Sequence, residues 1–240
     1  MGSYAEPARE SSDPGSSDQQ FGLDAKKKTL VAAERDEEAR AAWRVQVGRE
    51  RRDEWIFVDE CGAHISLIAL YARSPRGTRT IGKVPRNTGI KTTLIASFSL
   101  TGMGEALILK GAADASAFAT DIEQVLAPTL QPGQTVVLDT LNIHHGVRVR
   151  DAIEAKECRV VFLPSSSPDL SPTEQAFSQL KTCLRRIGAR TPEALQEAII
   201  QVLGMMSAQD AQNWFPHCSY LQREGEPIFP ETRQFEAQAF

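Results

Sequence analysis

Three carboxylates stand where metal-dependent chemistry would need them. Asp59 and Asp139 end the apolar runs Trp55–Val58 and Thr135–Leu138, and Glu174 follows a proline-rich stretch. A short β-favouring run that ends in Asp predicts a carboxylate at the carboxyl end of a buried strand, where α/β sheets bind their ligands. Three acids that converge there repel one another unless a cation neutralises them. Oxygen ligands without suitably spaced Cys or His indicate Mg²⁺ or Mn²⁺ rather than zinc.

Two divalent ions held by these carboxylates would suit an in-line displacement at phosphorus, which is chemistry on nucleic acid. In this hypothesis Asp139 bridges both ions, while Asp59 and Glu174 each hold one. Each acid also has an ordinary interpretation, because a lone Asp after a strand more often caps a turn. Ser171-x-x-Glu174, with Pro172 between, fits a capping box in which the Glu174 carboxylate bonds the Ser171 backbone N–H. The three acids taken together favour the metal site.

Charge is spread unevenly along the 240 residues. The net charge of −4 argues against a protein that coats DNA. Within residues 140–190, however, eight basic residues outnumber five acidic ones. A locally basic surface beside an acidic centre suits a polyanionic substrate, although each basic residue also fits an ordinary solvated helix face. The candidates for DNA contact are His144, Arg148, Lys181 and Arg185.

Other chemistries lack their sequence patterns. The four cysteines are far apart and form no CxxC pair, which indicates reduced thiols without a zinc knuckle or a disulfide framework. No GxSxG elbow is present, and Gly102-Met103-Gly104 suits a hairpin turn rather than a phosphate cradle. The chain has neither a signal-peptide pattern nor an apolar run of 18 residues. We therefore expect a cytoplasmic protein with no membrane association.

The order of apolar patterns predicts an α/β fold. Strands are expected over Trp55–Glu60, Lys91–Leu100, Ala106–Lys110, Gln134–Asp139 and Arg159–Leu163. Helices are expected over Ser116–Leu130, Gly146–Lys156 and Thr173–Gly188 and from Thr191 onward, while Ala63–Tyr71 fits either a strand or a short helix. An antiparallel meander followed by alternating helices and strands predicts a ribonuclease-H-like mixed five-stranded sheet with helices on both faces.

Composition predicts four segments. Residues 1–24 are polar and are expected to form a disordered N-terminal tail, and residues 25–53 a helical linker. Residues 54–220 would form the catalytic domain, and residues 221–240 a C-terminal tail.

At these motifs the sequence resembles a transposase of the DDE superfamily, from the bacterial insertion-sequence branch related to mariner elements. The resembling segments are Phe57–Glu60, Arg73–Gly77, Val137–Asp139 with His144, and Phe162–Glu174. The 34 residues between Asp139 and Glu174 equal the spacing typical of that branch. The resemblance extends from about Lys26 to Tyr220.

The resemblance implies that Asp59, Asp139 and Glu174 are the catalytic, metal-binding triad and hold two Mg²⁺ or Mn²⁺ ions. It implies cleavage of DNA at transposon ends and attack of the freed 3′-hydroxyl on target DNA, with DNA as the partner of a homodimer. On this interpretation the helical linker is the remnant of a longer DNA-reading region.

The sequence departs from the family pattern at three positions of these motifs. Thr140 and Ser171 stand where the family usually has Asn, and Ser166 stands where it usually has an aromatic residue. Two alternatives therefore stay open. One is a truncated, non-catalytic transposase remnant, and the other is a different ribonuclease-H-like nuclease, such as a junction resolvase.

Overall fold

The computed structural model describes residues 32–47, 52–69, 71–140, 146–218 and 220. The chain divides into two compact units after Ala33. The unit that begins at Glu34 contains every helix and strand given below. Among the described residues, no helix has the length and apolar character needed to cross a membrane.

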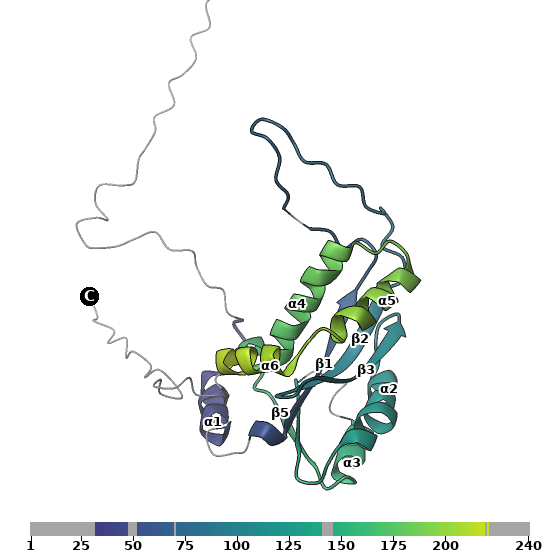
Figure 1. Cartoon of the computed structure of the whole chain (residues 1–240). Helices are drawn as coiled ribbons and strands as arrows, with labels where there is room; N and C mark the ends of the chain where they lie inside the picture. Colours follow the sequence, from purple (N-terminus) through teal and green to yellow (C-terminus); the bar gives the residue numbers. More distant parts are fainter. Residues whose placement is uncertain (1–31, 48–51, 70, 141–145, 219, 221–240) are drawn as a thin grey trace, which may run out of the picture. The chain divides into compact units, whose positions relative to one another are not determined.

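A five-stranded sheet in the order β3-β2-β1-β4-β5 forms the centre of this unit (Figure 1). Its strands are β1 (Trp55–Ala63), β2 (Thr92–Ser99), β3 (Gly102–Lys110), β4 (Thr135–Leu138) and β5 (Arg159–Phe162). β1, β2 and β3 form an antiparallel meander, and β4 and β5 run parallel to β1. The predicted mixed sheet and its five strands are confirmed.

Helices cover both faces of the sheet, as predicted (Figure 1). One face carries α4 (Pro172–Ile187), α5 (Pro192–Leu203) and α6 (Ala208–Trp214), and α1 (Glu37–Val47) adds to the same core. The other face carries α2 (Ala115–Asp121), which continues as a π turn (Ile122–Leu126), and α3 (Val147–Glu154). Because side chains alternate along a strand, Trp55 and Phe57 of β1 enter the first core and Val58 enters the second.

Two local predictions need correction. The apolar pattern of residues 63–71 predicts a strand or a short helix, but β1 ends at Ala63, and the described residues beyond it form a turn and irregular chain. The hairpin turn lies at residues 100–101 rather than at the two glycines, which belong to β3. Gly102, the first residue of β3, has φ +106°, a conformation that side chains with a Cβ disfavour, so a glycine suits this position.

α6 was not predicted, because its seven residues are mostly polar and only Ala211 is buried. A capping box does mark its start. The Ser207 hydroxyl accepts from the Asp210 backbone N–H, and the Asp210 carboxylate accepts from the Ser207 backbone N–H.

One carboxyl is buried on the α2 face of the sheet. The Asp121 side chain lies in α2 with 4% of its surface exposed, and its Oδ1 atom has no hydrogen-bond partner among the described residues. Burial, reinforced by the charge of Glu60, raises the pKa of Asp121 to about 7. The folded protein therefore holds this proton more tightly than the unfolded chain does.

Asp121→Asn should remove a pH-dependent loss of stability. With a folded pKa near 7 and an ordinary value of 3.8, wild type loses stability as pH rises between these values, by up to about 1.4 kcal/mol per pH unit. The variant should thus gain free energy of unfolding relative to wild type at pH 8 and much less at pH 5. Urea denaturation at the two pH values measures this. Asp151→Asn, at an exposed position of α3, is the control. An Asp121→Asn effect equal at both pH values would contradict the assignment.

Candidate active site

The parallel pairing of β1 with β4 places two predicted carboxylates next to each other, one on β1 and one just after β4. Phe57 pairs with Val137, so the same register sets Asp59 level with Asp139 just beyond the paired residues. Phe57 and Val137 both enter the core on the α4 face. Because side chains two positions apart share a face, Asp59 and Asp139 also face α4.

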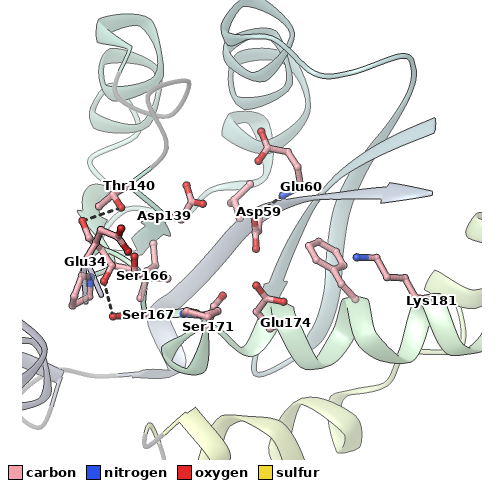
Figure 2. Close-up of a pocket in the computed structure, with 17 residues that line it drawn as sticks. Glu34, Asp59, Glu60, Asp139, Thr140, Ser166, Ser167, Ser171, Glu174 and Lys181 are labelled. Carbon is pink, nitrogen blue, oxygen red and sulfur yellow. Dashed lines mark hydrogen bonds between the residues drawn. The ribbon is translucent and has the colours of Figure 1, made fainter. Parts of the chain in front are cut away.

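The first turn of α4 supplies the third carboxylate. Pro172 occupies the first helical position after Ser171, as predicted, but the predicted capping box does not form. The Ser171 side chain makes no cap hydrogen bond, and its backbone N–H donates to the Pro168 carbonyl at 3.0 Å. The capping interpretation of Glu174 is therefore wrong, and its exposed carboxylate faces the same space as the two aspartates (Figure 2).

These three side chains line one cavity of about 600 Å³. Figure 2 shows Asp59 between Asp139 and Glu174, with Lys181 farther along α4. Residues 163–168, which follow β5, line the same cavity. The structure thus brings together from β1, β4 and α4 the acids that the sequence singled out.

Two hydrogen bonds orient the Asp59 carboxylate. Its Oδ1 accepts from the Glu60 backbone N–H at 2.7 Å, and its Oδ2 accepts from the Thr173 hydroxyl at 3.0 Å. The Thr173 hydroxyl has one proton, so the 2.5 Å contact between the Ser171 and Thr173 hydroxyls must have Ser171 as its donor. Sequence reasoning did not identify Thr173 as a partner of Asp59, because 114 positions separate the two residues.

The surroundings of the Asp59 carboxyl disfavour its ionised form. Burial raises the pKa of Asp59 to about 7, and the charge of Asp139 adds to the rise, against the two hydrogen bonds that lower it. Near neutral pH the carboxyl therefore retains a proton for part of the time. A divalent cation in the cavity would take the place of that proton and relieve the repulsion between the two aspartates.

The donor atoms fit Mg²⁺ or Mn²⁺ in chemical type, because all three are carboxylate oxygens. Within the described ranges, however, no three His, Cys, Asp or Glu side chains stand close enough to hold one ion in common. One or two protein carboxylates per ion, completed by water and phosphate oxygens, is the arrangement that Mg²⁺ usually adopts. The cavity has the volume for such a shared coordination.

Residues that were not predicted from the sequence anchor the loop before Glu174. Arg40 of α1, which is fully buried, donates to both carboxylate oxygens of Asp169 at 3.0 and 2.6 Å. The Tyr220 hydroxyl donates to the Leu170 carbonyl at 2.5 Å and accepts from Trp43 Nε1 at 3.2 Å. Segments far apart in sequence therefore fix the loop from which α4 and its Glu174 start.

The four predicted DNA contacts are distributed differently. Lys181 lines the cavity, and its ammonium opposes the rise that burial causes in the pKa of the Cys61 thiol, so it faces β1. Arg185 lies one turn farther along α4, half-buried. Arg148 of α3 instead pairs with Glu123 through bonds of 2.9 and 2.7 Å. His144 lies outside the described residues.

The departures from the family pattern fall on the cavity wall. The Thr140 and Ser165 hydroxyls lie 3.5 Å apart across the ends of β4 and β5. Ser166 has φ +53°, in the left-handed region that residues other than glycine seldom adopt. The wall is therefore a tight turn of small side chains where the family usually has an aromatic residue.

A family model described as DDE superfamily endonuclease matches residues 54–196, which is more than half of the chain. The chain belongs to this family. No curated protein matches the chain.

Among solved structures, the chain is similar to a pre-cleavage Mos1 transpososome, with TM-score 0.67, 16% identity and coverage of 83% of this chain and 65% of that one. A mariner Mos1 paired-end complex with Mg gives TM-score 0.62, 16% identity and coverage of 83% and 66%. The catalytic domain of Mos1 mariner transposase gives TM-score 0.59, 13% identity and coverage of 80% and 92%. The ribonuclease-H-like fold is thereby confirmed, and the chain spans about two thirds of the longer relatives.

Asp169→Asn should destabilise the protein more than Arg40→Met. The first change leaves a fully buried guanidinium without its carboxylate. Among the described residues, its remaining acidic neighbour is Glu37, whose Oε2 lies 3.5 Å from Nε, and stranding a buried charge typically costs about 3–5 kcal/mol. The second leaves a carboxylate whose side chain is 51% exposed and can be hydrated. Urea unfolding of both variants and the double variant measures the order. A larger loss for Arg40→Met would contradict it.

Proposed function

We propose that this chain is the catalytic core of a transposase that cleaves DNA strands at insertion-sequence ends and transfers the freed 3′-hydroxyl to target DNA. The observation that supports this best is the shared level of Asp59 and Asp139 on parallel strands, facing Glu174 across one cavity. Family membership supports the nuclease class. Similar Mos1 structures include a paired-end complex with a left transposon end and paired-end complexes with Mn and with Mg, which supports DNA and a divalent metal for this chain.

In the proposed reaction, Asp59, Asp139 and Glu174 would hold two Mg²⁺ or Mn²⁺ ions. When bound, the ions would activate the attacking oxygen and stabilise the leaving oxygen in an in-line displacement at phosphorus. The chain's own residues position the carboxylates. The Thr173 hydroxyl and the Glu60 N–H orient the Asp59 carboxylate, and the anchored loop before Ser171 sets the start of α4.

Lys181 is assigned to DNA binding in this proposal. It stands two helical turns from Glu174 on the same cavity, and its ammonium is the only Lys or Arg group among the described residues that line the cavity. A lysine binds phosphate as a compact positive charge with three donors. We assign it to a phosphate of the bound strand, with Arg185 continuing the contact one turn on. A homodimer on DNA, in the cytoplasm of a bacterial cell, completes the proposal.

A second candidate function is a non-catalytic member of the family that keeps the fold. It is favoured by the spacing of the acids, because no three potential ligands in the described part of the chain stand close enough for one ion. The two proposals differ in whether the isolated protein cleaves DNA when Mg²⁺ or Mn²⁺ is added.

Asp139→Asn should abolish metal-dependent nicking of supercoiled plasmid DNA. The substitution keeps the size of the side chain and removes the charge of a proposed metal ligand, so the rate should fall by at least about a hundredfold, as when a group that stabilises developing charge is lost. Gel electrophoresis with Mn²⁺, with Mg²⁺ and with EDTA provides the measurement. Asp151→Asn, exposed on α3, is the matched control and should nick at the wild-type rate. Nicking by Asp139→Asn at the wild-type rate would overturn the proposed site, and no nicking by wild type would favour the non-catalytic candidate.

A further inference from the structure

Two buried hydroxyls link the start of α4 to Asp59 of β1. The Ser171 hydroxyl donates to the Thr173 hydroxyl at 2.5 Å, and the Thr173 hydroxyl donates to Asp59 Oδ2 at 3.0 Å. We call these two hydrogen bonds the hydroxyl relay. Ser171 is 5% exposed and Thr173 is 1% exposed, so water has little access to either side chain. The relay therefore lies in the protein interior and ends at a carboxylate that lines the cavity.

The hydroxyl relay has a single direction. A hydroxyl group carries one proton, and an ionised carboxylate only accepts hydrogen bonds. Thr173 therefore donates its proton to Asp59, and its oxygen accepts from Ser171. A hydroxyl that accepts one hydrogen bond is polarised and donates a stronger one. Ser171 thus strengthens the hold of Thr173 on the carboxylate without touching the carboxylate itself.

The loop before α4 fixes the donor end of the relay. The Ser171 backbone N–H donates to the Pro168 carbonyl at 3.0 Å, and the carbonyl of the preceding residue, Leu170, accepts from the Tyr220 hydroxyl. The Ser171 side chain makes no cap hydrogen bond to α4, so its hydroxyl serves Thr173 instead. One of the departures from the family pattern, a serine where the family usually has Asn, thereby has a structural role.

The relay also ties one proposed metal ligand to another. Thr173 is the residue next to Glu174 in the first turn of α4, whereas Asp59 lies on β1. The hydrogen bond between Thr173 and Asp59 therefore joins β1 to the helical turn that carries Glu174. Loss of this bond would free the Asp59 carboxylate to rotate and would loosen its placement relative to Glu174.

The relay leaves Asp59 able to bind a cation. A carboxylate has about four lone-pair sites. Among the described residues, Glu60 N–H occupies one site on Oδ1, and the Thr173 hydroxyl occupies one site on Oδ2. A further site on each oxygen remains for an ion, so metal binding does not require the relay to break. Groups that hydrogen-bond a metal ligand in this way orient it and raise the affinity of the site.

We propose, on the basis of the function proposed above, that Ser171 and Thr173 are positioning residues that set the affinity of the cavity for Mg²⁺ or Mn²⁺ by holding the Asp59 carboxylate. A relay with a merely structural role would stabilise the start of α4 and leave the metal affinity of the folded protein unchanged. The two roles are separated by replacing the Thr173 hydroxyl with a methyl group of similar size.

The test measures Mn²⁺ affinity in matched variants. Thr173→Val removes the bond to Asp59, Thr173→Ser keeps the hydroxyl, and Thr182→Val makes the same change at an exposed position of α4. Calorimetric titration of Mn²⁺ gives the Kd, and the Mn²⁺ dependence of plasmid nicking gives the concentration for half-maximal rate. Thr173→Val should raise both values by about tenfold to a hundredfold. Thr173→Ser and Thr182→Val should match wild type. At saturating Mn²⁺, Thr173→Val should approach the wild-type rate, because all three carboxylates remain.

Ser171→Ala tests the direction of the relay. It removes the donor to Thr173 and keeps the bond from Thr173 to Asp59, so the Kd for Mn²⁺ should rise less than in Thr173→Val. Because Ser171 acts only through Thr173, the double variant should match Thr173→Val alone. Additive effects of the two changes would contradict the relay.

Melting temperatures without metal show that each variant is folded, and Thr173→Ala replaces Thr173→Val if the valine variant does not fold. A folded variant with the wild-type Kd and half-maximal concentration overturns the inference, as does a rate lowered equally at every Mn²⁺ concentration. If wild type binds Mn²⁺ only when DNA is present, the half-maximal concentration decides.

Asp139→Asn in the same assays separates this inference from the proposed function. If wild type binds Mn²⁺ and nicks while Asp139→Asn does neither, the proposed function stands even where Thr173→Val behaves as wild type does. A wild type that neither binds Mn²⁺ nor nicks overturns both.

Discussion

The parallel register of β1 with β4 is the constraint on which the site depends. It sets Asp59 level with Asp139 and turns both toward α4, and a slip of one residue would move one of them to the opposite face of the sheet. The same register sets two half-buried carboxyls side by side. Burial, and after it the charge of Asp139, raises the pKa of Asp59 to about 7, so the cavity favours a bound cation. Glu174, from α4, adds a third acid to that cavity. The geometry of the sheet thus creates both the opportunity for metal binding and the electrostatic reason for it.

The surrounding structure makes this arrangement rigid. A carboxylate serves a reaction only if its rotamer is fixed, and Asp59 is fixed by hydrogen bonds from Glu60 and Thr173. Glu174 depends on the loop before α4, which Arg40 and Tyr220 hold from segments remote in the sequence. The buried Arg40 guanidinium donates two hydrogen bonds to Asp169 of that loop, so α1 and the loop stabilise each other. α1 is therefore a structural part of the site as well as a helix that precedes the sheet.

Local pattern predicted much of this fold. Apolar runs located all five strands, and proline with a capping threonine located the start of α5 at Thr191. Those signals are local, so they can be read from a single sequence. The contacts of Arg40 with Asp169 and of Thr173 with Asp59 span 129 and 114 positions and have no local signature. The capping-box prediction at Ser171 was wrong for a related reason, because the Ser171 hydroxyl instead bonds Thr173, whose own hydroxyl bonds Asp59. A tertiary contact with Asp59, made through Thr173, thus takes the place of the local capping box.

The most direct measurement is a calorimetric titration of Mn²⁺ into wild type and into Asp139→Asn, with the melting temperature followed in parallel. A ligand that binds only the folded state raises its stability in proportion to occupancy. If the cavity holds divalent metal, wild type should bind Mn²⁺ and melt at a higher temperature, while Asp139→Asn should lose both effects and remain folded. Equal binding and equal stabilisation in the two proteins would place the metal elsewhere. Negligible binding in both would show that the three carboxylates form no metal site in the absence of DNA.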